Sequence, residues 1–98
     1  MFRHTVMFRW APEASQKRRT RTLKELAGLG ELVSDLGSLR VGVDAGLVAG
    51  NFDVVVTVDF ADADGYLAYA EHPEHLRVIA DHIKPAVSAR SAIQYEVT

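Results

Sequence analysis

Four segments of the chain alternate apolar and polar residues with a period of two, as half-buried β-strands do. They span residues 2–10, 39–44, 52–60 and 91–97. The third is the clearest, because every second residue in it is apolar from its first position to its last. In the fourth, one side carries Ile93, Tyr95 and Val97. We expect the apolar side of each strand to face the core.

A helical spacing of apolar residues follows the first strand. Ser15 is a suitable N-cap for this helix, and its charged residues fall largely on the side opposite the apolar ones. Gly28 and Gly30 weaken the last turn, so we expect the helix to fray near residue 29. Residues 31–36 then predict either a short helical turn or an irregular connection.

Two further helices are predicted between the third and fourth strands. Asp62 is a good N-cap for a helix that runs to about Glu71. Its expected buried stripe consists of Tyr66, Leu67 and Ala70. Pro73 suits the first turn of the next helix, where its missing N–H costs nothing. That helix is predicted to run to Lys84, and Pro85 closes it.

The order strand, helix, strand, strand, helix pair, strand predicts an α+β fold in a single domain, residues 1–98. It is the order of the ferredoxin-like βαββαβ arrangement, a four-stranded antiparallel sheet with helices on one face. The other face carries Met7, Val55 and some charged groups. A half-apolar bare face favours pairing with a second copy. We therefore predict a homodimer in which two sheets stack or close into a barrel.

Composition narrows the possible partners. The chain is 48% hydrophobic and 24% charged, which is typical of a folded domain, and its net charge of −2 favours neither nucleic acid nor an anionic membrane. The basic run at residues 17–21 is interpreted as a solvated helix face rather than a phosphate-binding patch. The absence of cysteine excludes disulfides, thiolate catalysis and cysteine-based zinc sites. No signal-peptide pattern or membrane span is visible, so the predicted location is the cytoplasm.

Residues 69–75 hold the strongest candidate chemistry. An imidazole takes and returns a proton near neutral pH, and a tyrosine hydroxyl donates a hydrogen bond to a developing enolate or carbonyl oxygen. His75 as base and Tyr69 as donor would make a minimal unit for proton abstraction next to a carbonyl. His4, on the apolar face of the first strand, could complete the set. The alternative is that Tyr69 packs in the core with its hydroxyl tied to the backbone, and that His4 is a satisfied core or edge histidine.

The other histidines of the chain have more modest interpretations. His72 precedes Pro73, and capping of the next helix is favoured over catalysis. A metal site built from His72, His75 and His82 is a weaker alternative, because Pro73 breaks the helical spacing. We therefore predict neither a metal nor a cofactor. The predicted ligand pocket is formed by Phe2, Val6, Leu26, Val54, Val56, Leu67 and His72.

Several segments resemble the stress-responsive dimeric α/β-barrel (Dabb) family. They are residues 2–8, residues 50–53, the Tyr-x-x-His-Pro-x-His pattern at 69–75, the Lys84-Pro85 helix end and residues 95–97. The resemblance extends over essentially the whole chain. It implies a ferredoxin-like protomer and a dimer whose eight strands form a barrel. Many members have no assigned activity, and some are linked to stress responses.

The resemblance also implies candidate roles. One plant member, olivetolic acid cyclase, closes a linear polyketide by aldol condensation without a metal. Its catalytic tyrosine and histidine match Tyr69 and His75, and a pocket histidine matches His4. A further pocket histidine falls on Val54, so the polar set is incomplete here. Three functions follow as hypotheses: a cofactor-free cyclase-like lyase for a hydrophobic carbonyl compound, a non-catalytic stress-related or ligand-binding dimer, and a cofactor-free monooxygenase.

Overall fold

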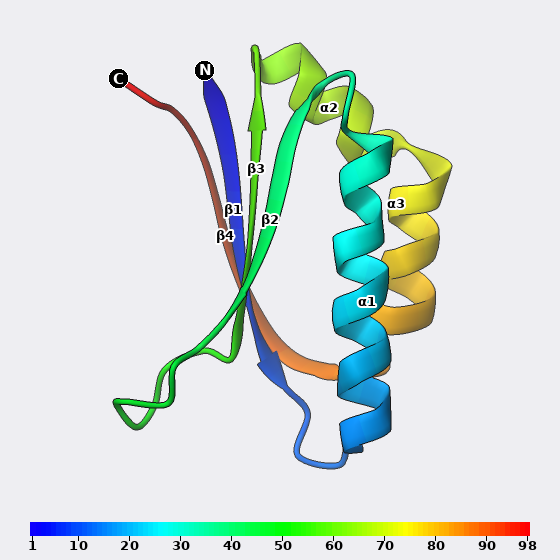
Figure 1. Cartoon of the computed structure of the whole chain (residues 1–98), viewed down its shortest axis with the longest axis vertical. Coiled ribbons are helices and arrows are strands. Elements are labelled where there is room, and N and C mark those ends of the chain that lie inside the picture. Colours follow the sequence, from blue (N-terminus) through cyan, green and yellow to red (C-terminus); the bar gives the residue numbers. More distant parts are fainter.

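An antiparallel sheet of four strands carries a layer of helices on one face (Figure 1). The computed structural model describes residues 1–98. The strands are β1 (Phe2–Trp10), β2 (Gly37–Val43), β3 (Val54–Phe60) and β4 (Val87–Glu96), in the spatial order β2-β3-β1-β4. The helices are α1 (Gln16–Leu32), α2 (Ala63–Glu71) and α3 (Pro73–Val78), and a π-helical turn (Ile79–Ile83) continues α3. The predicted ferredoxin-like βαββαβ fold is confirmed.

Helix α1 runs past the point at which it was expected to fray. Ser15 is the N-cap, and its Oγ accepts a hydrogen bond from the Arg18 N–H at 3.1 Å. The helix continues through both of its glycines to Leu32, so the predicted end near residue 29 was wrong. Each glycine costs about 1 kcal/mol in a helix, but burial of Leu29 and Val33 at this end offsets more than that.

The last strand is longer than predicted, and it faces the other way. Strand β4 begins at Val87, and its register with β1 sets Ile93 opposite Thr5 and Tyr95 opposite Arg3. Cross-strand partners share a face, so Ile93 and Tyr95 lie on the side away from the helices. They are 59% and 39% exposed. The expectation that this apolar side faces the core was therefore wrong.

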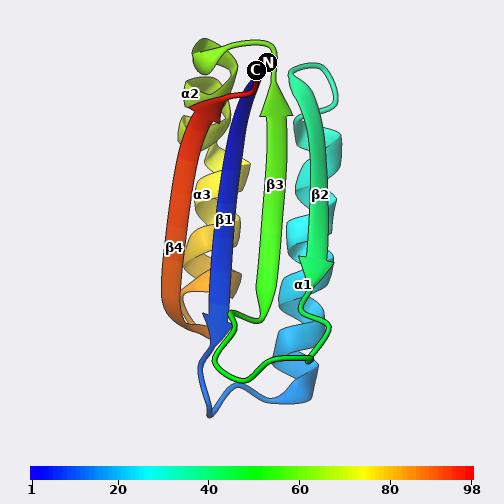
Figure 2. The same ribbon diagram turned by 90° about the vertical axis from the view of Figure 1, so that its left-hand side faces the viewer.

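The face of the sheet that lacks helices is turned toward the viewer in Figure 2. It combines apolar and charged groups. Met7 and Ile93 are exposed on it. Asp59 accepts from Arg3 at 2.6 Å and from Arg40 at 3.2 Å, and the Arg3 hydrogen bond is the largest cause of its lowered pKa. This face consequently carries exposed apolar residues beside a paired charge cluster. In the other layer, none of the helices has both the length and the apolar character needed to cross a membrane.

Candidate functional site

The joint between α2 and α3 positions the two residues of greatest interest. Helix α2 ends at Glu71, and His72 adopts an extended conformation before Pro73 starts α3. The His72 Nδ1 accepts a hydrogen bond from the Glu74 N–H at 3.1 Å, which confirms the predicted capping role. The resulting turn brings the rings of Tyr69 and His75 together, with their centroids 4.4 Å apart. The two groups face a common space.

That space is a cavity of about 90 Å³ between the sheet and the helices. The three predicted chemical groups, His4, Tyr69 and His75, all line it. Its remaining walls come from every layer of the fold and are mostly apolar. They are Val6, Phe8, Leu26, Leu29, Val56, Tyr66, Val78, Ile79, Ile83 and Arg90. Two of these belong to the π-helical turn, a distortion that is frequent at functional sites.

The predicted pocket walls are only partly correct. Three of them, Val6, Leu26 and Val56, do line the cavity, whereas four predicted residues do not. Leu67 is 52% exposed, because Tyr66 and Tyr69 occupy the inner side of α2. The other three are Phe2, which packs near the Tyr66 ring, Val54, which is buried at the start of β3, and His72, which caps α3.

His75 presents a free lone pair to the cavity. Its Nδ1 lies 3.1 Å from the Ala70 carbonyl oxygen, which can only accept, so Nδ1 carries the proton and Nε2 is bare. Burial lowers the pKa of His75, and the charges of Arg90 and His72 lower it further against the opposing effect of the Ala70 bond. The ring is therefore neutral at pH 7, with Nε2 ready to accept a proton.

His4 has the opposite tautomer. Its Nδ1 lies 2.8 Å from the Nε2 amide of Gln94, which donates, so the His4 proton sits on its own Nε2. Burial lowers the pKa of His4 to about 4, with smaller contributions from Arg90 and His75. His4 is consequently a neutral hydrogen-bond donor at pH 7 and cannot act as the base.

Tyr69 supplies a second neutral donor. It is 3% exposed, and burial raises its pKa to about 12. Its hydroxyl makes no hydrogen bond within the chain, so the alternative in which the backbone holds it does not apply. Buried polar groups are normally paired. A free hydroxyl beside a cavity is therefore a group available to a ligand.

Sequence reasoning missed Arg90 and Gln94, which both lie on the helix-facing side of β4. The strand was predicted to begin at residue 91 and to turn its other side inward, which placed Gln94 outside and left Arg90 in a loop. The alternation in the sequence groups Arg90, Ala92 and Gln94 on one side of the strand, but it gives no sign that this side faces the helices. The β1 register sets Arg90 opposite Phe8 and Gln94 opposite His4.

His82 lies apart from the other histidines. Its Nε2 is 3.7 Å from a Glu25 carboxylate oxygen on α1, and its Nδ1 is buried without a partner. The three histidines weighed as alternative metal ligands do not come together, and no three metal-ligating side chains of other kinds do so.

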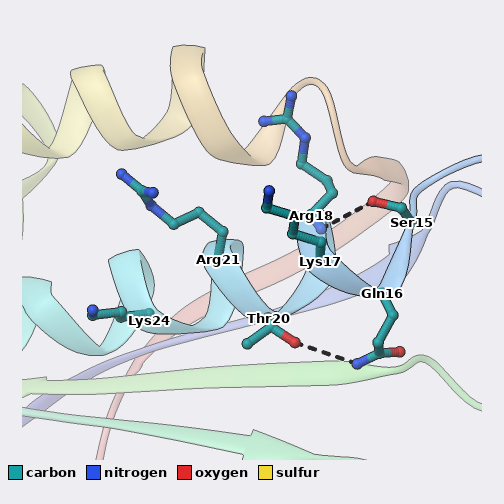
Figure 3. Close-up of a pocket in the computed structure, with 7 residues that line it drawn as sticks. All are labelled: Ser15, Gln16, Lys17, Arg18, Thr20, Arg21 and Lys24. Carbon is teal, nitrogen blue, oxygen red and sulfur yellow. Dashed lines mark hydrogen bonds between the residues drawn. The ribbon is translucent and has the colours of Figure 1, made fainter.

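The N-terminal turns of α1 form a second hollow, of different character (Figure 3). No hydrophobic residue lines it. The side chains of Arg18, Arg21 and Lys24 spread along the helix and do not converge on one point. Arg18 donates to the Asp81 carbonyl oxygen at 3.4 Å, and Arg21 pairs with Glu25. This arrangement agrees with the interpretation of the basic run as a solvated helix face.

The family model of the stress responsive A/B barrel domain matches residues 2–97. The chain belongs to the Dabb family. No curated protein matches it. Among solved structures, a dimeric ferredoxin-like protein of unknown function from Thermobifida fusca is 32% identical, with a TM-score of 0.88 over 98% of this chain and 90% of that one.

Other solved structures share the fold at lower identity. A hydroxynitrile lyase from Passiflora edulis is 20% identical, with a TM-score of 0.81 over 99% of this chain and 93% of the lyase. An antibiotic biosynthesis monooxygenase is 13% identical, with a TM-score of 0.76 over 100% and 99% of the two chains. At these identities the likeness establishes a common fold and leaves the activity to the site.

Proposed function

We propose that this Dabb protein is a cofactor-free, lyase-type enzyme that moves a proton at the carbon next to the carbonyl group of a small hydrophobic compound. One observation carries the proposal. A single cavity presents one imidazole lone pair, on His75, and two neutral donors, on His4 and Tyr69. A base beside donors for an oxyanion is what enolate chemistry needs.

In the proposed step, the carbonyl oxygen of the substrate accepts hydrogen bonds from the Tyr69 hydroxyl and the His4 Nε2–H. The His75 Nε2 takes the proton from the adjacent carbon. The electron pair of the broken C–H bond forms the enolate, whose negative oxygen is stabilised by the two donors. The enolate then attacks an acceptor or expels a leaving group, and His75 returns its proton to the product.

The size of the cavity limits the substrate. Pockets for drug-sized ligands have volumes of about 300–1,000 Å³. The cavity of about 90 Å³ is well below that range. We therefore favour a compact carbonyl compound over an extended polyketide chain.

The proposal is tested by proton exchange in D₂O, followed by ¹H NMR on a panel of small ketones and aldehydes. We expect exchange next to the carbonyl above the uncatalysed rate, a loss of about 10²-fold or more in His75→Gln, and a smaller loss in Tyr69→Phe. His72→Asn is the matched control, since it removes a histidine outside the cavity and asparagine still caps. Exchange that persists at the wild-type rate in His75→Gln would contradict the proposal and leave a non-catalytic binding protein.

We also propose that the chain is a homodimer joined through the bare face of its sheet. Similar structures are dimeric ferredoxin-like proteins, and the exposed Ile93 lies on this face, on the edge strand β4. Ile93→Glu should shift the sedimentation coefficient from dimer to monomer. Leu67→Glu places the same charge on the helix layer and should leave the dimer intact. A cytoplasmic location stays a prediction.

A further inference from the structure

Arg90 stands apart from the other arginines of the chain. It is the one arginine whose side chain makes no hydrogen bond or ion pair within the protein. The others are bound by carboxylates or carbonyl oxygens: Arg3, Arg9, Arg18, Arg19, Arg21, Arg40 and Arg77. Arg90 is also the one permanently charged residue that lines the cavity. An unpaired guanidinium beside the candidate reacting groups calls for a function.

Arg90 both lines the cavity and is exposed to solvent. It projects from the helix-facing side of β4, opposite Phe8, and β4 is an edge strand of the sheet. The residue is exposed, yet its charge is felt at both His4 and His75. No carboxylate lines the cavity to neutralise it. An anionic group bound there would sit within reach of the two histidines.

We propose that the substrate bears a carboxylate, which Arg90 binds at the mouth of the cavity, so that the substrate class is the small oxo acids. This inference rests on the proposed function for the carbonyl end of the molecule. The planar fork of a guanidinium matches a carboxylate with two parallel hydrogen bonds, a geometry that favours carboxylate capture by a single arginine. Arg90 then binds the carboxylate end of the substrate, and the Tyr69 and His4 donors bind its carbonyl end.

The cavity volume agrees with this division. A cavity of about 90 Å³ accommodates a carbonyl group and a short alkyl end. The charged end would remain at Arg90, where solvent still reaches, and its desolvation cost is thereby kept low. Arg90 acts in binding and orientation. The proton transfer itself is left to His75.

The experiment measures binding of acetoacetate and its neutral counterpart, methyl acetoacetate, from the shifts of the His4 and His75 Cε1–H signals in NMR titrations. A longer series, 4-oxopentanoate and 5-oxohexanoate with their methyl esters, varies the distance between the carbonyl and the carboxylate. We expect at least one acid to bind about tenfold or more tightly than its ester. Arg90→Gln should abolish this preference, and Arg90→Lys should retain part of it.

Lys24→Gln, which removes one positive charge from the solvated face of α1, is the matched control and should keep the wild-type preference. Equal affinity for every acid and its ester in the wild type would overturn the proposal, as would a preference that survives in Arg90→Gln. Glycerone phosphate is the third probe. If it binds more tightly than the acids in an Arg90-dependent manner, the carboxylate assignment is overturned in favour of a phosphate.

The two proposals fail separately. Arg90-dependent binding of an acid without His75-dependent proton exchange would overturn the proposed function and leave the carboxylate site standing. Exchange that depends on His75 and proceeds equally well with acids and esters would overturn the carboxylate site and leave the proposed function standing.

Discussion

Burial of His4 in its neutral form makes the stability of the fold depend on pH. The pKa of His4 is about 4 in the folded protein, against 6.5 for an unperturbed histidine. As the pH falls below 6.5, the unfolded chain binds a proton at this position that the folded chain refuses. Stability is therefore lost between pH 6.5 and pH 4, and below pH 4 the loss is constant because both states are protonated.

The size of this effect follows from the difference of about 2.5 pKa units. At 1.36 kcal/mol per unit, the full loss is about 3 kcal/mol, of which about 2 kcal/mol has appeared by pH 5. Small domains are stabilised by only about 5–15 kcal/mol in total. One histidine thus governs a substantial share of the acid sensitivity of the protein.

Urea unfolding at pH 7.5 and pH 5, at one fixed protein concentration, tests this reasoning in the wild type and in His4→Phe. The free energy of unfolding of the wild type should fall by about 2 kcal/mol more on acidification than that of the variant. Phenylalanine keeps an aromatic ring at this position but has no titrating group. The lowered pKa of His75 acts in the same direction in both proteins and cancels in the comparison. His72→Asn should lose as much as the wild type. An equal loss in His4→Phe would refute the assignment of His4 as a buried neutral group.

Three other changes have definite expected outcomes. Gly37→Ala should destabilise the protein by about 2 kcal/mol or more in urea unfolding, because a Cβ there would overlap the Asp59 carbonyl oxygen. Gly28→Ala, with open space around it, should instead stabilise by about 0.5–1 kcal/mol, and a loss there would show that α1 is strained. Gln94→Leu should remove the donor that fixes the His4 tautomer, giving mixed tautomers in ¹⁵N NMR and about tenfold slower exchange in the assay above. Gln94→Glu should move the proton to Nδ1 and raise the pKa of His4, and an unchanged tautomer would contradict the role given to Gln94.

The fold could be predicted from the sequence because its information is local. The alternation in β3 and the caps at Ser15 and Asp62 fix elements that need no distant partner. The His72-Pro73 joint is equally local, and its capping role was predicted correctly. The error at the end of α1 arose where a local glycine penalty competes with burial against the sheet.

Strand β4 shows where local information ends. One of its sides offers Ile93 and Tyr95 and the other offers Arg90 and Gln94, so hydrophobicity alone assigns the apolar side to the core. In the structure, the register of β4 with β1 turns the apolar side away from the helices. This register joins the two ends of the chain, so local sequence patterns do not reveal it. The apolar side is then free for a second copy, as the proposed dimer requires.

Local sequence information identifies residues of the candidate site but does not fix the role of each one. The proton on His75 is placed by Ala70, five positions away and on the preceding helix, so its free lone pair follows from local structure. The proton on His4 is placed by Gln94, ninety positions away, and no pattern in the sequence connects the two. Sequence reasoning could therefore name the two imidazoles that line the cavity, but their proposed division into base and donor depends on which face of β4 turns inward. In the proposed mechanism the base and one donor are both histidines, and only their hydrogen-bond partners distinguish them. Because Gln94 is the partner of His4, its mutation is as informative as mutation of the histidines themselves.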